Sequence, residues 1–370
     1  MDFKTAMEHY RAGTASGEER RLVEEELEKS RLIAEYLDSQ WETEAVEELP
    51  QADMKKVRRN LRKRNALIVL TSLILAAAML LGTVHLAIPA LESRYASPET
   101  YTYNEFHSDM NLALIAYADL FSPSQKIYNL KSVKTGFAAY NLTVSQWHAD
   151  DHGDQSYLTA YLEKGELTFP EGFWDYVPSN ILERATYPFS YMDGEFDRRT
   201  RESLEQLPGY VQVTAAVSFP EDLSMEELIA FRAFLEDGYM DWIGIRTSPL
   251  DTQMYPLAGM KPFSGGLVVD CLNDEYPYFD IHGSKATPEI LEAHFKALLT
   301  FSQDQYHAGT GIEVINFQGD SFYQQALDYI EENGVYAYGC FVSGPPQLFL
   351  DLLDSGAASQ VWIQSARIST

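Results

Sequence analysis

The sequence predicts three parts: an α-helical N-terminal domain, a single transmembrane helix, and an α+β extracytoplasmic domain with ferredoxin-like βαβ units. Three observations lead to this fold class. The stretch 66–91 contains no charged side chain. Apolar residues recur at helical spacing before it, and strand-like alternation interleaved with short helical patterns follows it. With 45% hydrophobic and 13% aromatic residues, the 370-residue chain has enough apolar material for packed cores.

The first element is a pair of amphipathic helices in residues 1–45. Gly13 interrupts the apolar pattern between them, and Ser16 with Glu19 has the spacing of a capping box at the start of the second helix. About 45 residues in two helices bury too little apolar surface to be stable alone, so a protein partner is expected. The residues predicted to meet that partner, some of which must instead pack inside the pair, are Phe3, Met7, Tyr10, Leu22, Val23, Glu24, Leu27, Glu28, Ile33 and Leu37.

An acidic and then basic juxtamembrane linker is expected over residues 46–65. It leads into the transmembrane helix, residues 66–90, which is long enough for a bilayer core of about 30 Å because that thickness takes about 20 helical residues. Pro89 is expected to mark its far end. The basic residues before the stretch indicate a cytoplasmic N-terminus and an extracytoplasmic C-terminal domain in the cell membrane. The small residues Ala76, Ala77, Ala78 and Gly82 offer a packing surface for a second membrane protein within the lipid bilayer.

Charge is divided into three blocks along the chain. Residues 1–50 carry 6 basic and 14 acidic side chains, residues 54–64 carry 7 basic and no acidic ones, and residues 92–370 carry 15 and 40. The formal net charge of −27 argues against direct nucleic-acid binding, because phosphates repel a protein of that sign.

The outer region divides into a first part, 98–204, and a C-terminal α+β sensor or regulator domain, 205–370. The first part shows no clear pattern. In the second, two strand–helix–strand patterns are predicted, and they lie at 210–246 and 334–364. Between them, Thr287 caps a helix that runs to about Gln303, and residues 278–282 are predicted as a strand.

Motifs of catalysis are absent from the sequence: it has no nucleophile elbow, phosphate-binding glycine loop or His-Glu-x-x-His helix. We therefore expect no enzyme, no catalytic residue and no cofactor. The histidines and aspartates of 148–154 are interpreted as an acidic turn rather than a metal site. Cys271 and Cys340 allow either one disulfide or two buried thiols.

A family resemblance is carried by two regions. The run Tyr10–Ile33 resembles the start of bacterial membrane-bound anti-sigma factors. Zinc-binding members of that superfamily have a His-x3-Cys-x2-Cys motif where this chain has Glu26, Ser30 and Ile33, so the resemblance implies a metal-free variant. Residues 205–366 are similar to the C-terminal domain of the sigma-factor-regulator family of Gram-positive bacteria, notably at Ala215–Phe219, Asp241–Gly244 and Val342–Pro345.

The resemblance implies a transmembrane anti-sigma factor. Residues 1–45 would sequester an extracytoplasmic-function sigma factor, and the outer domain would sense the state of the envelope or bind a membrane partner. The alternative is a surface-anchored receptor or enzyme that acts through its extracytoplasmic domain. Failure of residues 1–50 to recover a sigma factor would favour that alternative.

Overall fold

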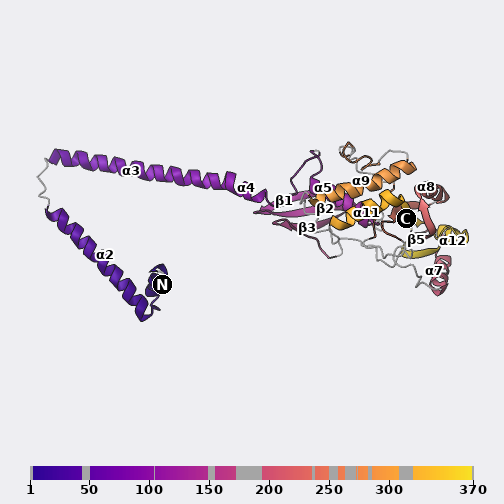
Figure 1. The fold of residues 1–370 in the computed structure, drawn as a ribbon, viewed down its shortest axis with the longest axis horizontal. Helices are drawn as coiled ribbons and strands as arrows, with labels where there is room; N and C mark the ends of the chain where they lie inside the picture. The colour runs from indigo at the N-terminus through magenta and orange to yellow at the C-terminus, as the bar shows by residue number, and fades with distance from the viewer. Residues whose placement is uncertain are drawn as a thin grey trace. The chain divides into compact units, whose positions relative to one another are not determined.

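The computed structural model describes residues 3–43, 51–103, 105–148, 155–171, 194–235, 238–249, 257–262, 272, 274–281, 286–307 and 320–368. The chain forms two compact units, Met1–Thr83 and Val84–Thr370. Figure 1 shows the elements in chain order. Helices form the described part of the first unit, and the second combines antiparallel sheets with helices, so the predicted fold class is confirmed.

The first unit contains the two predicted helices, α1 (Phe3–Arg11) and α2 (Gly17–Thr43). Gly13 adopts a φ of +74° in the turn between them, a conformation that glycine reaches without steric cost. The third helix, α3, spans Gln51–Gly82. Residues 51–65, expected in the linker, are therefore helical and continuous with the apolar stretch, because Lys and Arg are good helix formers.

One helical run in the described residues, Lys55–Glu92, is long and apolar enough to cross a membrane. It comprises most of α3, a π-helical turn at Thr83–Ala87 and the short helix α4 (Ile88–Glu92). The sequence predicted that Pro89 marks the end of the helix. Instead, the helix continues to Glu92, and Pro89 lies in α4 just after the π-helical turn. A proline cannot donate to the carbonyl four residues earlier, and a wider turn accommodates that missing bond.

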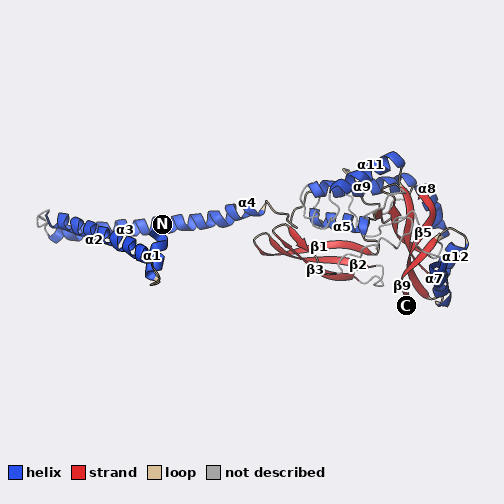
Figure 2. Ribbon diagram, turned by 60° about the horizontal axis from the view of Figure 1, so that its bottom comes forward, coloured by secondary structure: helices blue, strands red, loops and turns tan. Residues whose placement is uncertain are grey.

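The second unit opens with a buried helix, α5 (Asp109–Phe121), all of whose residues are buried. Ser108 caps its start by accepting a hydrogen bond from the Asn111 amide. An antiparallel meander follows, made of β1 (Gln125–Gly136), β2 (Ala139–His148), β3 (Gln155–Glu163) and β4 (Glu166–Thr168). The helix α5 contacts β1, so it covers one face of this sheet (Figure 2).

The second sheet has the strand order β7-β6-β8-β5-β9, with antiparallel neighbours throughout. Its elements are β5 (Val211–Ser224), α8 (Met225–Phe234), β6 (Tyr239–Ile245), β7 (Gly259–Met260), β8 (Tyr336–Gly344), α12 (Pro346–Asp354) and β9 (Gln360–Ile368). In each of the units β5-α8-β6 and β8-α12-β9, one strand of the other unit separates the two parallel strands. This is the split βαβ arrangement of a ferredoxin-like sheet, and it confirms the predicted core.

Helices cover the second sheet and join it to the meander. The helices α8 and α12 pack on β5, and α7 (Gly194–Gln206) packs on α12 and β9. The inserted helix α9 (Pro288–His307) contacts α5, α8, β7 and α11 (Asp320–Asn333). The Trp242 indole donates to the Asp119 carbonyl at 2.9 Å, and Lys261 pairs with the Asp119 carboxylate at 3.1 Å. One hydrophobic core therefore runs from α5 through both sheets.

The predicted strand at 278–282 is wrong for the described residues 278–281, which form turns. The Phe279 amide donates to the Tyr276 carbonyl, and Tyr278 has a φ of +62°, so the backbone is not extended. Phe279 and Ile281 are both buried. These apolar residues alternate with polar ones in the sequence, as in a strand, but Asp280 between them is buried too, so burial does not alternate here.

Two other expectations concern the outer unit. Cys340, in β8, is a free buried thiol, and burial raises its pKa. Cys271 lies outside the described residues, as do residues 149–154 of the expected acidic turn.

Candidate functional site

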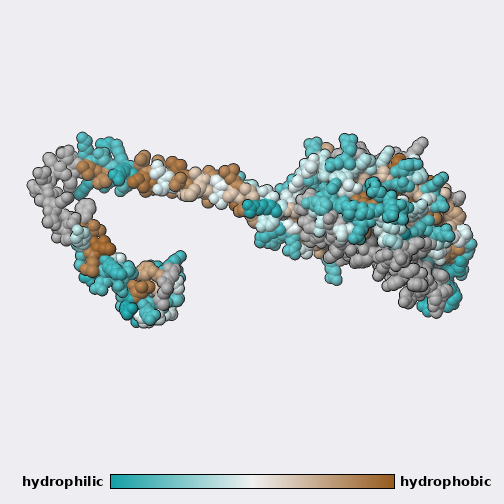
Figure 3. Space-filling view, in the orientation of Figure 1, coloured by the Kyte–Doolittle hydropathy of each residue, from teal (hydrophilic) through white to brown (hydrophobic). Residues whose placement is uncertain are grey.

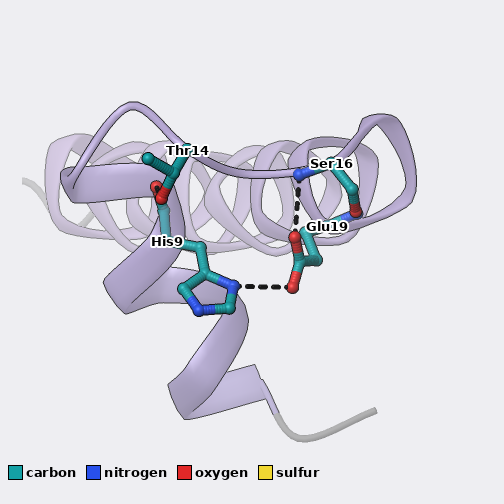
Figure 4. Close-up of polar contacts among 4 residues, drawn as sticks. All are labelled: His9, Thr14, Ser16 and Glu19. Atoms are coloured by element: carbon teal, nitrogen blue, oxygen red, sulfur yellow. Dashed lines mark hydrogen bonds and ion pairs between the residues drawn. The ribbon is translucent and has the colours of Figure 1, made fainter.

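The candidate site is the hairpin of α1 and α2, which contact each other. Its turn is held by a cluster of polar contacts around Glu19 (Figure 4). One carboxylate oxygen of Glu19 accepts from the Ser16 amide at 2.7 Å, and the other lies 2.8 Å from the His9 imidazole. The Glu19 amide in turn donates to the Ser16 hydroxyl at 3.4 Å, which completes the predicted capping box.

These contacts change the acidity of Glu19. The amide of Ser16, and then the hydrogen bond with His9, lower the pKa of the Glu19 carboxyl to about 2. The cap and the contact with His9 therefore use the same charged carboxylate, which links the end of α1 to the start of α2. The contact with His9 was missing from the sequence prediction, because the two residues are ten apart and face each other only across the turn.

The predicted partner-binding residues fall into two groups in the hairpin. Val23 is fully buried, together with Ala6 of α1, and Met7, Tyr10 and Leu22 are half-buried. The other apolar residues of the prediction are exposed: Phe3, Leu27, Ile33 and Leu37. The structure thus separates internal packing from a free apolar surface, a division that periodicity could not make.

Length explains why α2 is left uncovered. At 1.5 Å per residue, the nine residues of α1 extend about 13 Å, whereas the twenty-seven of α2 extend about 40 Å. Beyond Val23, side chains at positions 27, 33, 34 and 37 share one side of α2, and Leu27, Ile33 and Leu37 are 49%, 60% and 51% exposed. Figure 3 shows hydrophobic side chains on the half of α2 away from the turn. We call Leu27, Ile33, Ala34 and Leu37 the α2 stripe.

Acidic residues border the α2 stripe. The basic residues of this part of α2 are occupied: Lys29 pairs with Glu25 and Glu26, and Arg31 pairs with Glu35. Glu24 and Glu28 are exposed and have no ion pair within residues 3–43. Glu24 adjoins the stripe beside Leu27, and Glu28 lies one turn further along the same side of α2, so negative charge that is not neutralised within the hairpin begins at the edge of the stripe.

The positions that match a zinc motif lie on this same helix. Glu26, Ser30 and Ile33 follow one another on one side of α2, and Glu26 is engaged by Lys29 at 2.7 Å. Serine and isoleucine are not zinc ligands, so these residues do not fit the metal. No group of three or more His, Cys, Asp or Glu side chains placed to hold a metal ion was found among the described residues.

Comparison with known proteins bears on the second unit. Residues 204–366 match the family model described as sigma factor regulator C-terminal, which covers β5 to β9 and the helices between them. No curated protein and no solved structure matches the chain. The matched family is a family of sigma factor regulators. Separately, the described residues contain one helix that is long and apolar enough to cross a membrane. The split βαβ sheet lies within the matched range, so residues 204–366, somewhat less than half of the chain, are similar to the C-terminal domain of sigma factor regulators.

Proposed function

We propose that the protein is a transmembrane anti-sigma factor whose α1–α2 hairpin sequesters an extracytoplasmic-function sigma factor. The exposed α2 stripe carries this proposal. Burying its Leu and Ile side chains against a partner would contribute roughly 1.5–3 kcal/mol each, an amount the hairpin cannot recover within itself. Sequestration by binding needs no catalytic group.

The charge of the stripe's border favours a basic partner surface. Glu24 and Glu28 would face that surface as complementary charge, and an apolar helix face with an acidic rim suits insertion between the domains of a nucleic-acid-binding protein. A sigma factor has such a surface because it contacts DNA and RNA polymerase. The helix-in-groove mode of recognition then supplies most of the affinity through apolar side chains, and the rim charges supply orientation.

A membrane-crossing helix between the two units would put the second unit on the other side of the bilayer from the hairpin. The basic residues of 55–64 favour a cytoplasmic hairpin, so the acidic second unit would lie outside and sense envelope state. A non-permeant protease applied to intact cells tests this orientation. Cleavage within residues 1–50 would contradict it, and cleavage confined to the second unit would support it.

Recovery of a sigma factor with the tagged full chain from a lysate of its own cells tests the binding site. We expect Leu27→Asp and Leu37→Asp to lower recovery of the sigma factor at least tenfold, because a charge on the stripe cannot enter an apolar interface. Leu32→Asp is the matched control, since Leu32 is 60% exposed on a different side of α2. Recovery that is equal for all three variants would remove the stripe as the binding site.

A further inference from the structure

The end of the membrane-crossing helix is fastened to the meander of the second unit. Glu92, the last residue of α4, pairs with Lys134 of β1 at 2.6 Å, and its other carboxylate oxygen accepts from the Ala138 amide at 3.1 Å. Lys134 lies near the end of β1, and Ala138 lies in the turn that joins β1 to β2. A single carboxylate therefore holds the turn by its side chain and its backbone at once.

An aromatic contact strengthens this attachment, and two contacts of the β3–β4 turn bring a third segment to the same place. The rings of Tyr95 and Phe137 meet edge to face with centroids 6.0 Å apart. The Lys164 amide, in the β3–β4 turn, donates to the Ala138 carbonyl at 2.7 Å. A Cβ on Gly165 would lie 3.7 Å from the Ala96 amide nitrogen, so this turn also packs against the chain leaving α4. We call residues 92–96, 134–139 and 163–166 the membrane-proximal cluster.

The charge of this cluster differs from that of the unit around it. It contains three basic and three acidic side chains, whereas residues 92–370 as a whole carry 15 basic and 40 acidic ones. The cluster's charges are Glu92, Arg94, Lys134, Glu163, Lys164 and Glu166. Because the net charge here is zero, this end of an otherwise acidic unit is not repelled by anionic lipid headgroups.

Depth in the bilayer follows from the length of the uncharged stretch. Its 26 residues extend about 39 Å as a helix, roughly 9 Å more than the hydrocarbon core. The last residues before Glu92 therefore reach the headgroup layer. Tyr95 and Phe137 are 37% and 40% exposed at that level, where aromatic side chains are favoured.

We propose that the membrane-proximal cluster is a lipid-contacting surface that seats the second unit on the outer leaflet, with Glu92 fixing the meander to the membrane-crossing helix. Its occupant is the headgroup region of the bilayer, continuous with the lipid around α3 and α4. The inference rests on the proposed membrane crossing, but not on sigma-factor binding.

Depth-dependent fluorescence quenching of the full chain in phosphatidylcholine liposomes tests this surface. An environment-sensitive fluorophore is attached at Thr135→Cys in a Cys271→Ser background, leaving Phe137 intact. We expect lipids spin-labelled at the headgroup to quench it at least twofold more than lipids labelled deep in the acyl chain. The control position is Ala233→Cys, exposed on α8 at the opposite end of the unit from α4 (Figures 1 and 2). That fluorophore should not be quenched.

A fluorophore at Leu75→Cys, inside the uncharged stretch, separates two kinds of failure. Quenching of Leu75→Cys by the deep label, without quenching of Thr135→Cys, would overturn the lipid-contacting surface and leave the membrane crossing intact. Absence of quenching at Leu75→Cys would overturn both.

Two substitutions test the residues that form the surface. Phe137→Ser and Lys134→Glu should each reduce headgroup quenching at Thr135→Cys at least twofold. Phe234→Ser and Lys296→Glu are matched changes at exposed positions in helices α8 and α9, and they should leave it unchanged. Equal quenching in all four variants would overturn the assigned roles of Phe137 and Glu92.

Discussion

The long helices α2 and α9 differ in how much of each is buried by its own chain. The twenty residues of α9 include nine buried ones, packed against α5, α8 and α11. In α2, Val23 is the buried residue between positions 17 and 38, although leucine and isoleucine recur along its length. Both sequences are amphipathic. The difference teaches that an apolar helix face indicates burial without showing whether the covering surface belongs to the same chain.

The largest expected effect is in the core around α9. Phe301 is fully buried, and its ring lies 4.9 Å from that of Phe279 and 5.1 Å from that of Tyr276, measured between centroids. Phe301→Ala should lower the free energy of unfolding of the second unit by about 3–5 kcal/mol, because it leaves a cavity. Chemical denaturation in detergent, followed by near-ultraviolet circular dichroism, measures it. A loss below about 1 kcal/mol would show that this core is not closely packed.

A smaller effect is expected within the hairpin, and it sharpens the contrast between buried and exposed positions of α2. Val23→Ala should destabilise the α1–α2 hairpin by roughly 1.5–3 kcal/mol, because its side chain is fully buried. Leu37→Ala removes a larger but exposed side chain, so it should change hairpin stability by less than about 0.5 kcal/mol. Hydrogen exchange of α1 amides in the full chain measures both. Similar effects of the two changes would contradict the division into internal packing and free surface.

The two capping boxes allow the effect of one substitution, Ser→Ala at the cap, to be compared between the weakly packed hairpin and the strongly packed second unit. Ser16 with Glu19 begins α2, and Ser224 with Glu227 begins α8. Ser16→Ala and Ser224→Ala should each cost about 1 kcal/mol. In the second unit this corresponds to a fall in melting temperature of about 2–4 °C. In the hairpin it should open the first turn of α2 to hydrogen exchange, since little other packing holds that turn.

The smallest expected effect is a pH dependence at the hairpin turn. Because the pKa of Glu19 is lowered to about 2 from an ordinary 4.5, the unfolded chain binds its proton first as pH falls. The stabilisation is therefore complete above about pH 4.5 and is lost as pH falls toward 2. Hydrogen exchange of α1 amides across this range should show the change, and Glu19→Gln should abolish it. A stability that rises as pH falls would contradict the assigned sign.

Features of short sequence range were predictable. The uncharged stretch 66–91, the capping boxes at Ser16 and Ser224, and the two strand–helix–strand patterns all follow from interactions within about four residues or from a repeating side-chain pattern. The meander β1–β4 escaped prediction although β2 alternates buried Tyr140, Leu142 and Val144 with polar neighbours. That alternation was a usable signal. The strand predicted at 278–282 shows the opposite error, since apolar residues can alternate with polar ones in the sequence of a turn as well.

The sequence by itself determined the helices of the first unit, the segment that can cross a membrane and where charge accumulates, because periodicity, length and composition are local properties; the helices α5, α7 and α11 were not predicted. Tertiary structure decided the rest: the order of the second sheet, the burial of Val23 but not Leu37, the pairing of His9 with Glu19, and the attachment of Glu92 to Lys134. Each of these depends on which distant surfaces meet. The free energy that selects them comes from packing between elements, and no single segment contains it.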